Sequence, residues 1–223
     1  MKQDKPNVLE IQELKSKVSN FEKMIRAEPA EDRNKQITIT RSLFNSVDKE
    51  LEDGIVGSGL KVLNKEVARC YKELGIKKLD RLVVYKEDGV AAYQENILYI
   101  NKDKFNAMVT NPKEFFKVNV LELERNGKIR FLAINDQNNV RSYIFDHEFG
   151  HYLFEKYEKS KRNAYHELCE LYQKTIDNGY INKISEYAKF DKYEFFSELY
   201  AFSKQISCEL PKFLLDFINE VKR

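Results

Sequence analysis

Apolar residues near the start of the chain recur at helical spacing. Within residues 8–27 they step by three and four positions, at Ile11, Leu14, Val18, Phe21 and Ile25. This spacing predicts an amphipathic helix that packs on its own domain, with a partner-binding helix as the alternative. The polar segment 28–37 has no such period and contains Pro29, so it predicts a linker.

Between residues 37 and 75 the pattern changes from strand to helix. ITIT at 37–40 is β-prone, and a helix around 43–53 follows it. The glycine-containing segment 53–61 does not fit GxxxxGK[ST], so it predicts a turn rather than a phosphate-binding loop. The next helix covers about 60–74 and ends at Gly75.

The middle of the chain has the character of strands. RLVVYK at 81–86 predicts a strand, and 90–101, which follows an Asp-Gly turn signal, predicts a second strand or a hairpin. Residues 111–125 fit either a helix or a strand. KIRFLAIN at 128–135 predicts a further strand.

From Asn139 onward the apolar spacing is helical. We expect helices at about 139–160, 163–178, 191–206 and 210–222. Strands that precede a block of helices predict an α+β fold. We expect an N-terminal helix and linker at 1–36, followed by one domain at 37–223.

Composition and charge narrow the function classes. Hydrophobic residues make up 42% of the 223, which is enough for a substantial core. Lys+Arg 38 against Asp+Glu 36 leaves a formal net charge of +2, which argues against a dedicated nucleic-acid binder. No apolar stretch approaches the ~20 residues that span a bilayer, and the N-terminus lacks the apolar core of a secretory signal. Cys70, Cys169 and Cys208 form no CxxC pair, so we expect reduced thiols and an intracellular protein.

Two of the three histidines lie in one HExxH motif, HEFGH at 147–151. Residues four apart share a helix face, so His147 and His151 can both reach one metal ion. Glu148 lies about 100° around the helix, beside the metal, where it can take a proton from the attacking water. The motif therefore predicts a catalytic zinc site, with a chance HExxH or two structural histidines as the alternative. The histidines extend an apolar stripe of Val140, Ile144, His147, His151 and Phe154.

A catalytic zinc requires a third protein ligand. The metzincin position, six residues after the second histidine, holds Tyr157, which excludes that class. His166 lies on the next predicted helix and is expected to be an ordinary surface or half-buried histidine. The remaining possibility for the third ligand is a carboxylate from a second helix, which is the gluzincin arrangement.

Two carboxylates in the segment 191–202, DKYEFFSELYAF, meet this requirement. Glu194 and Glu198 are four residues apart and share one face of an aromatic-rich helix, where unpaired charge is costly. A metal would account for both carboxylates. Alternatively, Asp191 and Glu194 form a capping box and Glu198 is solvated.

HEFGH at 147–151 and EFFSE at 194–198 resemble the anthrax lethal factor-like metallopeptidases. This group includes the Pro-Pro endopeptidases and domains encoded by phages and mobile elements. The resemblance covers about residues 80–223 and is closest within 144–151 and 185–202. Ser197 replaces the usual Ala, and 106–138 matches nothing in the family, so the family's specificity does not carry over.

The resemblance implies a zincin-like fold, in which a small twisted sheet with an edge strand lies over the HExxH helix and the C-terminal half is helical. It implies one Zn²⁺ per chain, with Glu194 as the third ligand and Glu198 as a supporting carboxylate. Tyr187, seven residues before Glu194, would stabilise the oxyanion. The family's edge strand, which pairs with an extended substrate, corresponds to Ile97, Leu98, Tyr99 and Ile100.

We therefore expect a zinc metalloendopeptidase that acts on an extended peptide, with Glu148 as the general base. A catalytically silent, zinc-containing binding module of a mobile element or toxin system is the alternative. A nucleic-acid-associated protein fits the balanced charge least. We expect a cytoplasmic or phage-associated location and no membrane partner, with signal-independent export left open.

Overall fold

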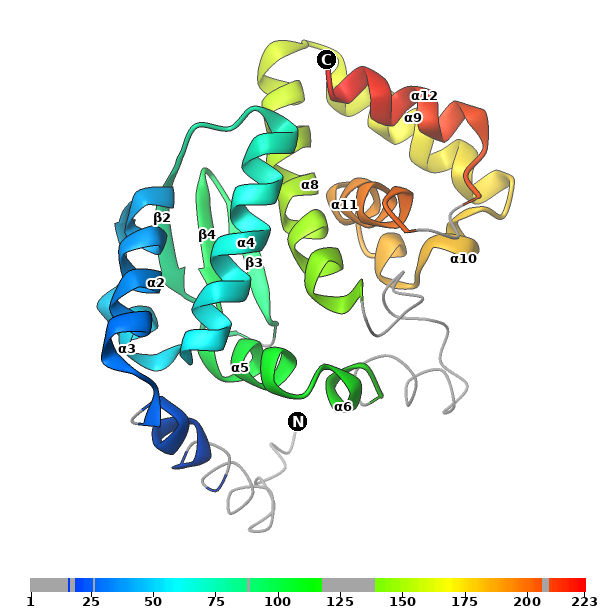
Figure 1. Ribbon diagram of the computed structural model, residues 1–223. Coiled ribbons are helices and arrows are strands. Elements are labelled where there is room, and N and C mark those ends of the chain that lie inside the picture. The colour runs from blue at the N-terminus through cyan, green and yellow to red at the C-terminus, as the bar shows by residue number, and fades with distance from the viewer. Residues whose placement is uncertain (1–15, 17–18, 26, 88, 118–138, 206–208) are drawn as a thin grey trace, which may run out of the picture.

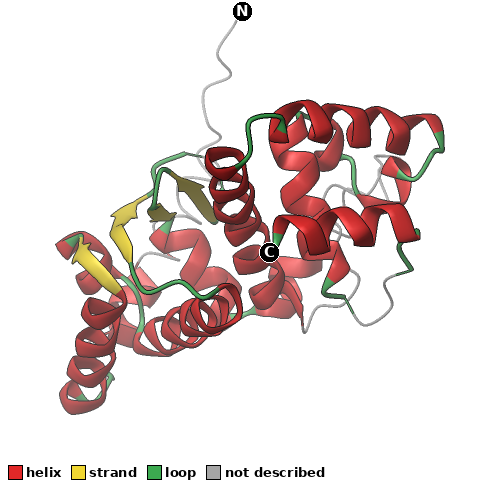
Figure 2. Ribbon diagram, turned by 90° about the horizontal axis from the view of Figure 1, so that it is seen from above, coloured by secondary structure: helices red, strands yellow, loops and turns green. Residues whose placement is uncertain are grey.

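A computed structural model describes residue 16 and residues 19–25, 27–87, 89–117, 139–205 and 209–223. This part of the chain is α+β and mostly helical, with one small mixed sheet, which confirms the predicted class. The long helix α8 (Val140–Ser160) lies between the sheet with its covering helices and a group of C-terminal helices (Figure 1). Figure 2 shows the strands together on one side of the molecule.

The sheet has four strands in the order β1-β2-β4-β3. Their bounds are Phe44–Val47 for β1, Leu79–Val84 for β2, Ala91–Gln94 for β3 and Ile97–Ile100 for β4. β1, β2 and β4 are parallel, and β3 is antiparallel to β4. Glu95 and Asn96 form the hairpin turn, both with the positive φ that a two-residue hairpin loop favours. The predicted hairpin at 90–101 is thereby confirmed.

The prediction of an edge strand at Ile97, Leu98, Tyr99 and Ile100 is wrong. These residues form β4, which is paired with β2 on one side and β3 on the other. The hairpin turns β3 outward, so β3 is the strand at this edge of the sheet, next to α8.

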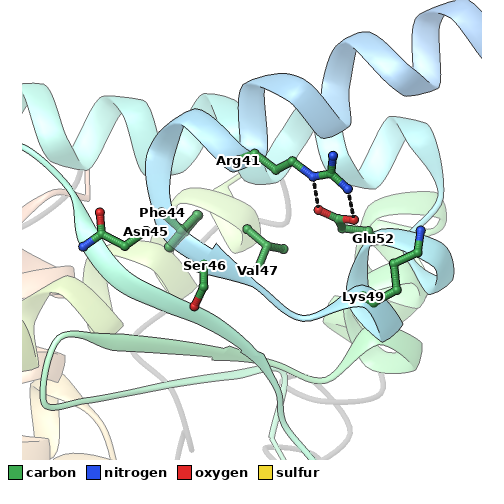
Figure 3. A pocket seen from close by; sticks show the side chains of 7 residues that line it. All are labelled: Arg41, Phe44, Asn45, Ser46, Val47, Lys49 and Glu52. Atoms are coloured by element: carbon green, nitrogen blue, oxygen red, sulfur yellow. Dashed lines mark hydrogen bonds and ion pairs between the residues drawn. The ribbon is translucent and has the colours of Figure 1, made fainter.

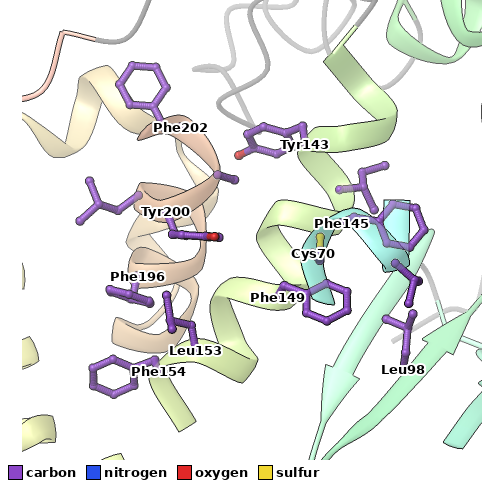
Figure 4. Packing of buried hydrophobic residues seen from close by; sticks show 14 of the residues in the cluster. Cys70, Leu98, Tyr143, Phe145, Phe149, Leu153, Phe154, Phe196, Tyr200 and Phe202 are labelled. Carbon is purple, nitrogen blue, oxygen red and sulfur yellow. The ribbon is translucent and has the colours of Figure 1, made fainter. Parts of the chain in front are cut away.

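One face of the sheet packs on helices. Leu82, Leu98 and Ile100 are buried, whereas Ile97 and Tyr99 on the opposite face are half-buried, which is the alternation of a sheet covered on one side. The covering helices are α4 (Gly57–Leu74) and α8, and Leu98 faces their aromatic core in Figure 4. α4 ends at Gly75 with φ 66°, which confirms the predicted helix stop.

The N-terminal part differs from the sequence prediction. Helix α2 (Ala30–Leu43) occupies both the expected linker at 28–37 and the expected strand at 37–40, and the 36/37 boundary falls inside it. Packing overrides the β propensity of ITIT here, because the buried Thr40 hydroxyl donates to Asn64 Oδ1 on α4 at 2.8 Å. The predicted helix at 43–53 is instead β1 followed by α3 (Lys49–Gly54).

Two further predictions fall largely on residues outside the described ranges. Of the expected helix at 8–27, residues 16, 19–25 and 27 are described and are helical. In the ambiguous segment 111–125, α6 (Pro112–Phe116) is a helix that follows α5 (Lys102–Thr110). The rest of that segment and the expected strand at 128–135 lie outside the described residues.

The four C-terminal helices are confirmed. They are α8, α9 (Ala164–Asp177), α11 (Lys192–Ser203) and α12 (Lys212–Val221), with the short α10 (Ile181–Ile184) and η3 (Tyr187–Lys189) between α9 and α11. Among the described residues, no helix combines the length and apolar character needed to cross a membrane.

Candidate metal centre

Helix α8 places both motif histidines on one face. The rings of His147 and His151 lie 5.0 Å apart between centroids, one helical turn from each other. His147 and Glu148 are buried and His151 is half-buried. The stripe that begins at Val140 therefore faces inward, as its spacing predicts.

Helix α11 approaches α8 closely opposite the motif. A Cβ atom on Gly150 would lie 2.8 Å from Ser197 Cα, closer than real Cβ contacts. The glycine therefore allows this approach of the two backbones. On either side of the contact, aromatic residues such as Phe154 and Phe196 hold the helices together, with ring centroids 5.1 Å apart (Figure 4).

The close approach brings Glu194 to the histidines. Its Oε2 atom lies 3.1 Å from His147 Nε2 and 3.4 Å from His151 Nε2. All three ligand atoms lie within 4.8 Å of one another. His147, His151 and Glu194 thus form a possible metal-binding triad drawn from two helices.

The donor set fits zinc. Two ligands ~2.0–2.1 Å from a tetrahedral ion lie roughly 3.3 Å apart, which is close to both measured separations. Glu194 Oε2 is buried, and no donor in the described part of the chain reaches it with hydrogen-bond geometry, although both imidazoles are near. A cation among the three atoms would satisfy this oxygen.

Glu198 holds His147 in place. Its Oε1 atom lies 2.7 Å from His147 Nδ1, and the side chain is 0% exposed. With Nδ1 engaged by this carboxylate, Nε2 is directed towards Glu194. This is the arrangement that orients metal-bound histidines in zinc sites.

The charges in the site act on one another. Burial alone would raise the pKa of Glu194, but the adjacent imidazoles of His147 and His151 outweigh it and hold this pKa well below its ordinary value. Burial alone would lower the pKa of His147, but Glu194 and Glu198 raise it well above 6.5. Carboxylates and imidazoles thus stabilise one another in the absence of a metal.

Glu148 has a different environment. Burial raises its pKa, and the charges of His147 and His151 only partly offset the rise. A hydrogen bond from the Tyr93 backbone on β3 also favours the ionised form. Glu148 is therefore positioned between the two histidines and the edge of the sheet.

Tyr187 lies beside the triad. Its ring centroid is 5.7 Å from that of His147. Burial, followed by the charges of Glu194 and Glu148, raises the pKa of its hydroxyl, so the phenol stays protonated and can donate a hydrogen bond.

The structure also tests the alternative assigned to Asp191. This residue is the N-cap of α11, and its carboxylate accepts from Tyr193 N at 2.7 Å and from Glu194 N at 2.9 Å. The cap is therefore real, but the Glu194 side chain turns to the histidines. His166 is exposed on α9 beside Glu170 and lies outside the triad.

Sequence reasoning missed one ion pair that ties the motif helix to α4. Arg69 Nη1 lies 2.8 Å from Asp146 Oδ1, directly before His147, and Arg69 Nε lies 2.8 Å from Glu66 Oε2. An acidic residue directly before the HExxH motif was the available signal, but its partner is 77 positions away.

A pocket lies apart from this centre. It lies at the β1 edge of the sheet, where Arg41 Nε contacts Glu52 Oε1 at 2.6 Å (Figure 3). None of the site residues predicted from the sequence lines it.

No protein-family model, curated protein or solved structure matches the chain.

Proposed function

We propose that the protein is a zinc-dependent metalloendopeptidase with a zincin-like fold of the gluzincin type. The observation that carries the proposal is the convergence of Glu194 Oε2 on both motif imidazoles, from a helix 43 residues further along the chain than His151. The resemblance to the lethal factor-like metallopeptidases supports the same assignment.

His147, His151 and Glu194 would hold the zinc, and Glu198 would orient His147. Bound zinc lowers the pKa of water and polarises the scissile carbonyl. Glu148 takes the proton from the attacking water and delivers it to the leaving amine. The Tyr187 hydroxyl donates to the oxygen on which negative charge develops.

β3 supplies a backbone edge for an extended substrate. Asn101 N donates to Val90 O at 2.9 Å, so alternate residues of β3 bond to β4, and Ala91 and Tyr93 direct their backbone groups away from it. Tyr93 is also the residue whose backbone contacts Glu148. A peptide added along this edge would run past the general base.

Glu148→Gln tests the proposal. We expect the variant to bind one zinc per chain, as the wild type does, and to hydrolyse a random peptide library roughly 10²–10⁴-fold more slowly, because the proton acceptor is lost. Metal analysis and mass spectrometry of the products measure both. Glu170→Gln, at an exposed carboxylate on α9, is the matched control and should behave as wild type.

Two results would contradict the proposal. Full activity in Glu148→Gln would remove Glu148 from the mechanism. A wild-type chain that binds zinc stoichiometrically and hydrolyses no peptide would show a binding module in place of an enzyme.

A further inference from the structure

Phe190 is an unusually exposed aromatic residue close to the metal centre. Its side chain is 79% exposed, whereas the other large exposed hydrophobic residues of the described chain reach at most 43%. It lies between η3 and the N-cap of α11, so it stands only four positions before Glu194. A ring so exposed and so close to the site is available to an apolar group of a ligand, because covering it removes apolar area from water.

The ring of Phe190 is held in place although it faces solvent. It stacks on Tyr187 with ring centroids 6.1 Å apart and an interplanar angle of 20°. The Phe190 backbone N–H also donates to Tyr187 O at 3.0 Å. These two contacts restrain the ring, while most of its surface stays open to a second apolar group.

Phe190 is within reach of a peptide bound at the metal centre. Tyr187 lies against His147 as well as Phe190, with centroid distances of 5.7 and 6.1 Å. The ring of Phe190 is thus at most about 12 Å from that of His147. An extended peptide at ~3.3 Å per residue covers this distance in about four residues.

We propose that Phe190 is a specificity-determining residue, which selects substrates carrying a large apolar side chain within about four residues of the scissile bond. The inference rests on the proposed peptidase function and names the substrate class of that site. The apolar side chain packs on the exposed face of Phe190 and removes that face from water, which is favourable in proportion to the area covered. A charged or small side chain at the same position gains nothing from the contact.

A different role for the ring would be to support Tyr187. In that case the loss of Phe190 would slow hydrolysis of all peptides equally, because Tyr187 acts on the carbonyl and not on a side chain. Selection of a side chain changes the ranking of peptides instead. The two roles are therefore separated by the cleavage profile rather than by the rate.

The test compares cleavage of a random peptide library by zinc-loaded wild type, Phe190→Ala and Phe190→Tyr. We expect the wild type and Phe190→Tyr to favour large apolar residues at one position within four residues of the cleaved bond. Phe190→Ala should lose this preference about tenfold at that position alone. Leu215→Ala, at an exposed apolar residue of α12, is the matched control and should keep it. An unchanged profile in Phe190→Ala, or a uniform loss of rate, would overturn the inference and leave the peptidase function standing.

A binding measurement keeps the inference testable without turnover. Zinc-loaded Glu148→Gln and the double variant Glu148→Gln, Phe190→Ala are compared on a peptide array. Capture of peptides rich in large apolar residues by the first and its loss in the second would support the role of Phe190. Equal capture by both would overturn it, even if the wild type hydrolyses nothing and the proposed function fails.

Discussion

At position 150 any side chain would separate the two helices that carry the metal centre. The Cβ of an alanine would meet the backbone of Ser197 rather than the end of a flexible side chain, so the helices would have to move apart. A shift of this kind would also move Glu194 away from the histidines.

Gly150→Ala should therefore lower both stability and zinc affinity. We expect a loss of about 1–3 kcal/mol from overpacking, against ~1 kcal/mol that alanine contributes to helix propensity. Urea unfolding and zinc titration measure the two effects. Lys156→Ala, at an exposed position of the same helix, should leave both unchanged. Normal zinc affinity in Gly150→Ala would show that the contact does not set the ligand positions.

Glu198→Gln tests the hydrogen bond to His147 Nδ1. Removing the charge from this buried carboxylate should weaken zinc binding roughly 10–100-fold, because the imidazole is less basic and less well oriented. Competition with a chromophoric chelator measures the affinity, with Glu170→Gln as the control. Unchanged zinc affinity would show that Glu198 contributes only to packing.

At this scale the HExxH motif predicted the two histidines, and the resemblance of the Glu194 segment to the metallopeptidases implied the third member of the triad. The sequence did not predict the role of Gly150, because the close approach depends on a residue 47 positions away. Nor did it predict the Arg69–Asp146 pair, which joins two helices that no local pattern relates.

Among the elements, Lys161 links the end of α8 to α9 and α12. Lys161, just after α8, contacts Glu167 Oε2 on α9 at 2.7 Å and Glu220 Oε1 on α12 at 2.6 Å. Hydrogen bonds from Lys161 and Tyr157 lower the pKa of Glu220 below 4.5. The contribution of Glu220 to stability is therefore present above pH 4.5 and is lost as the pH falls through the lowered pKa.

Lys161→Met should destabilise the chain at pH 7. The difference from wild type should shrink as the pH falls below about 4.5, and also in high salt, because the pair is partly exposed. Urea unfolding between pH 3 and pH 7 in metal-free protein measures this. Lys159→Met removes only a contact to Glu155 within α8 and should change little. A difference that does not depend on pH would assign the effect to packing of the lysine stem.

Long amphipathic helices were predictable because a single face repeats along them. α9 and α12 follow this rule, whereas α8 and α11 each contain a run of eight consecutive buried residues. α2 was not predictable, since its polar first half and β-branched second half are stabilised by contacts with α4 and α3. One of these is the Arg33 guanidinium, which donates to Ile55 O at 2.8 Å.

For the molecule as a whole, strand order decides which backbone edge the proposed peptide substrate would meet. Periodicity indicated the hairpin but not which of its strands lies outside, because this depends on the pairing of β4 with β2. The expected edge at β4 was wrong for that reason. The backbone N–H of Ala91, which points outward from β3, can be used to test whether a substrate binds at this edge.

Ala91→Pro removes an outward N–H and leaves the bonds between β3 and β4 in place. We expect kcat/KM for peptides to fall about fivefold, the effect of one hydrogen bond of about 1 kcal/mol, with little change in melting temperature. Ala92→Pro removes an N–H that faces β4 and should instead lower the melting temperature. Unchanged kcat/KM in Ala91→Pro would exclude this edge from substrate binding and leave the metal centre unaffected.

The paired carboxylates of α11 make the site sensitive to helix register. Glu194 and Glu198 are four residues apart, so sliding α11 by about 6 Å would still present a carboxylate to the histidines. In that slipped state Phe202 would occupy the place of Glu198, and His147 Nδ1 would face a hydrocarbon ring. Ala201 would then stand in the place of Ser197 and fit against Gly150 equally well, so the contact between the helices permits both registers, and the hydrogen bond between Glu198 and His147 Nδ1 is what favours the observed one.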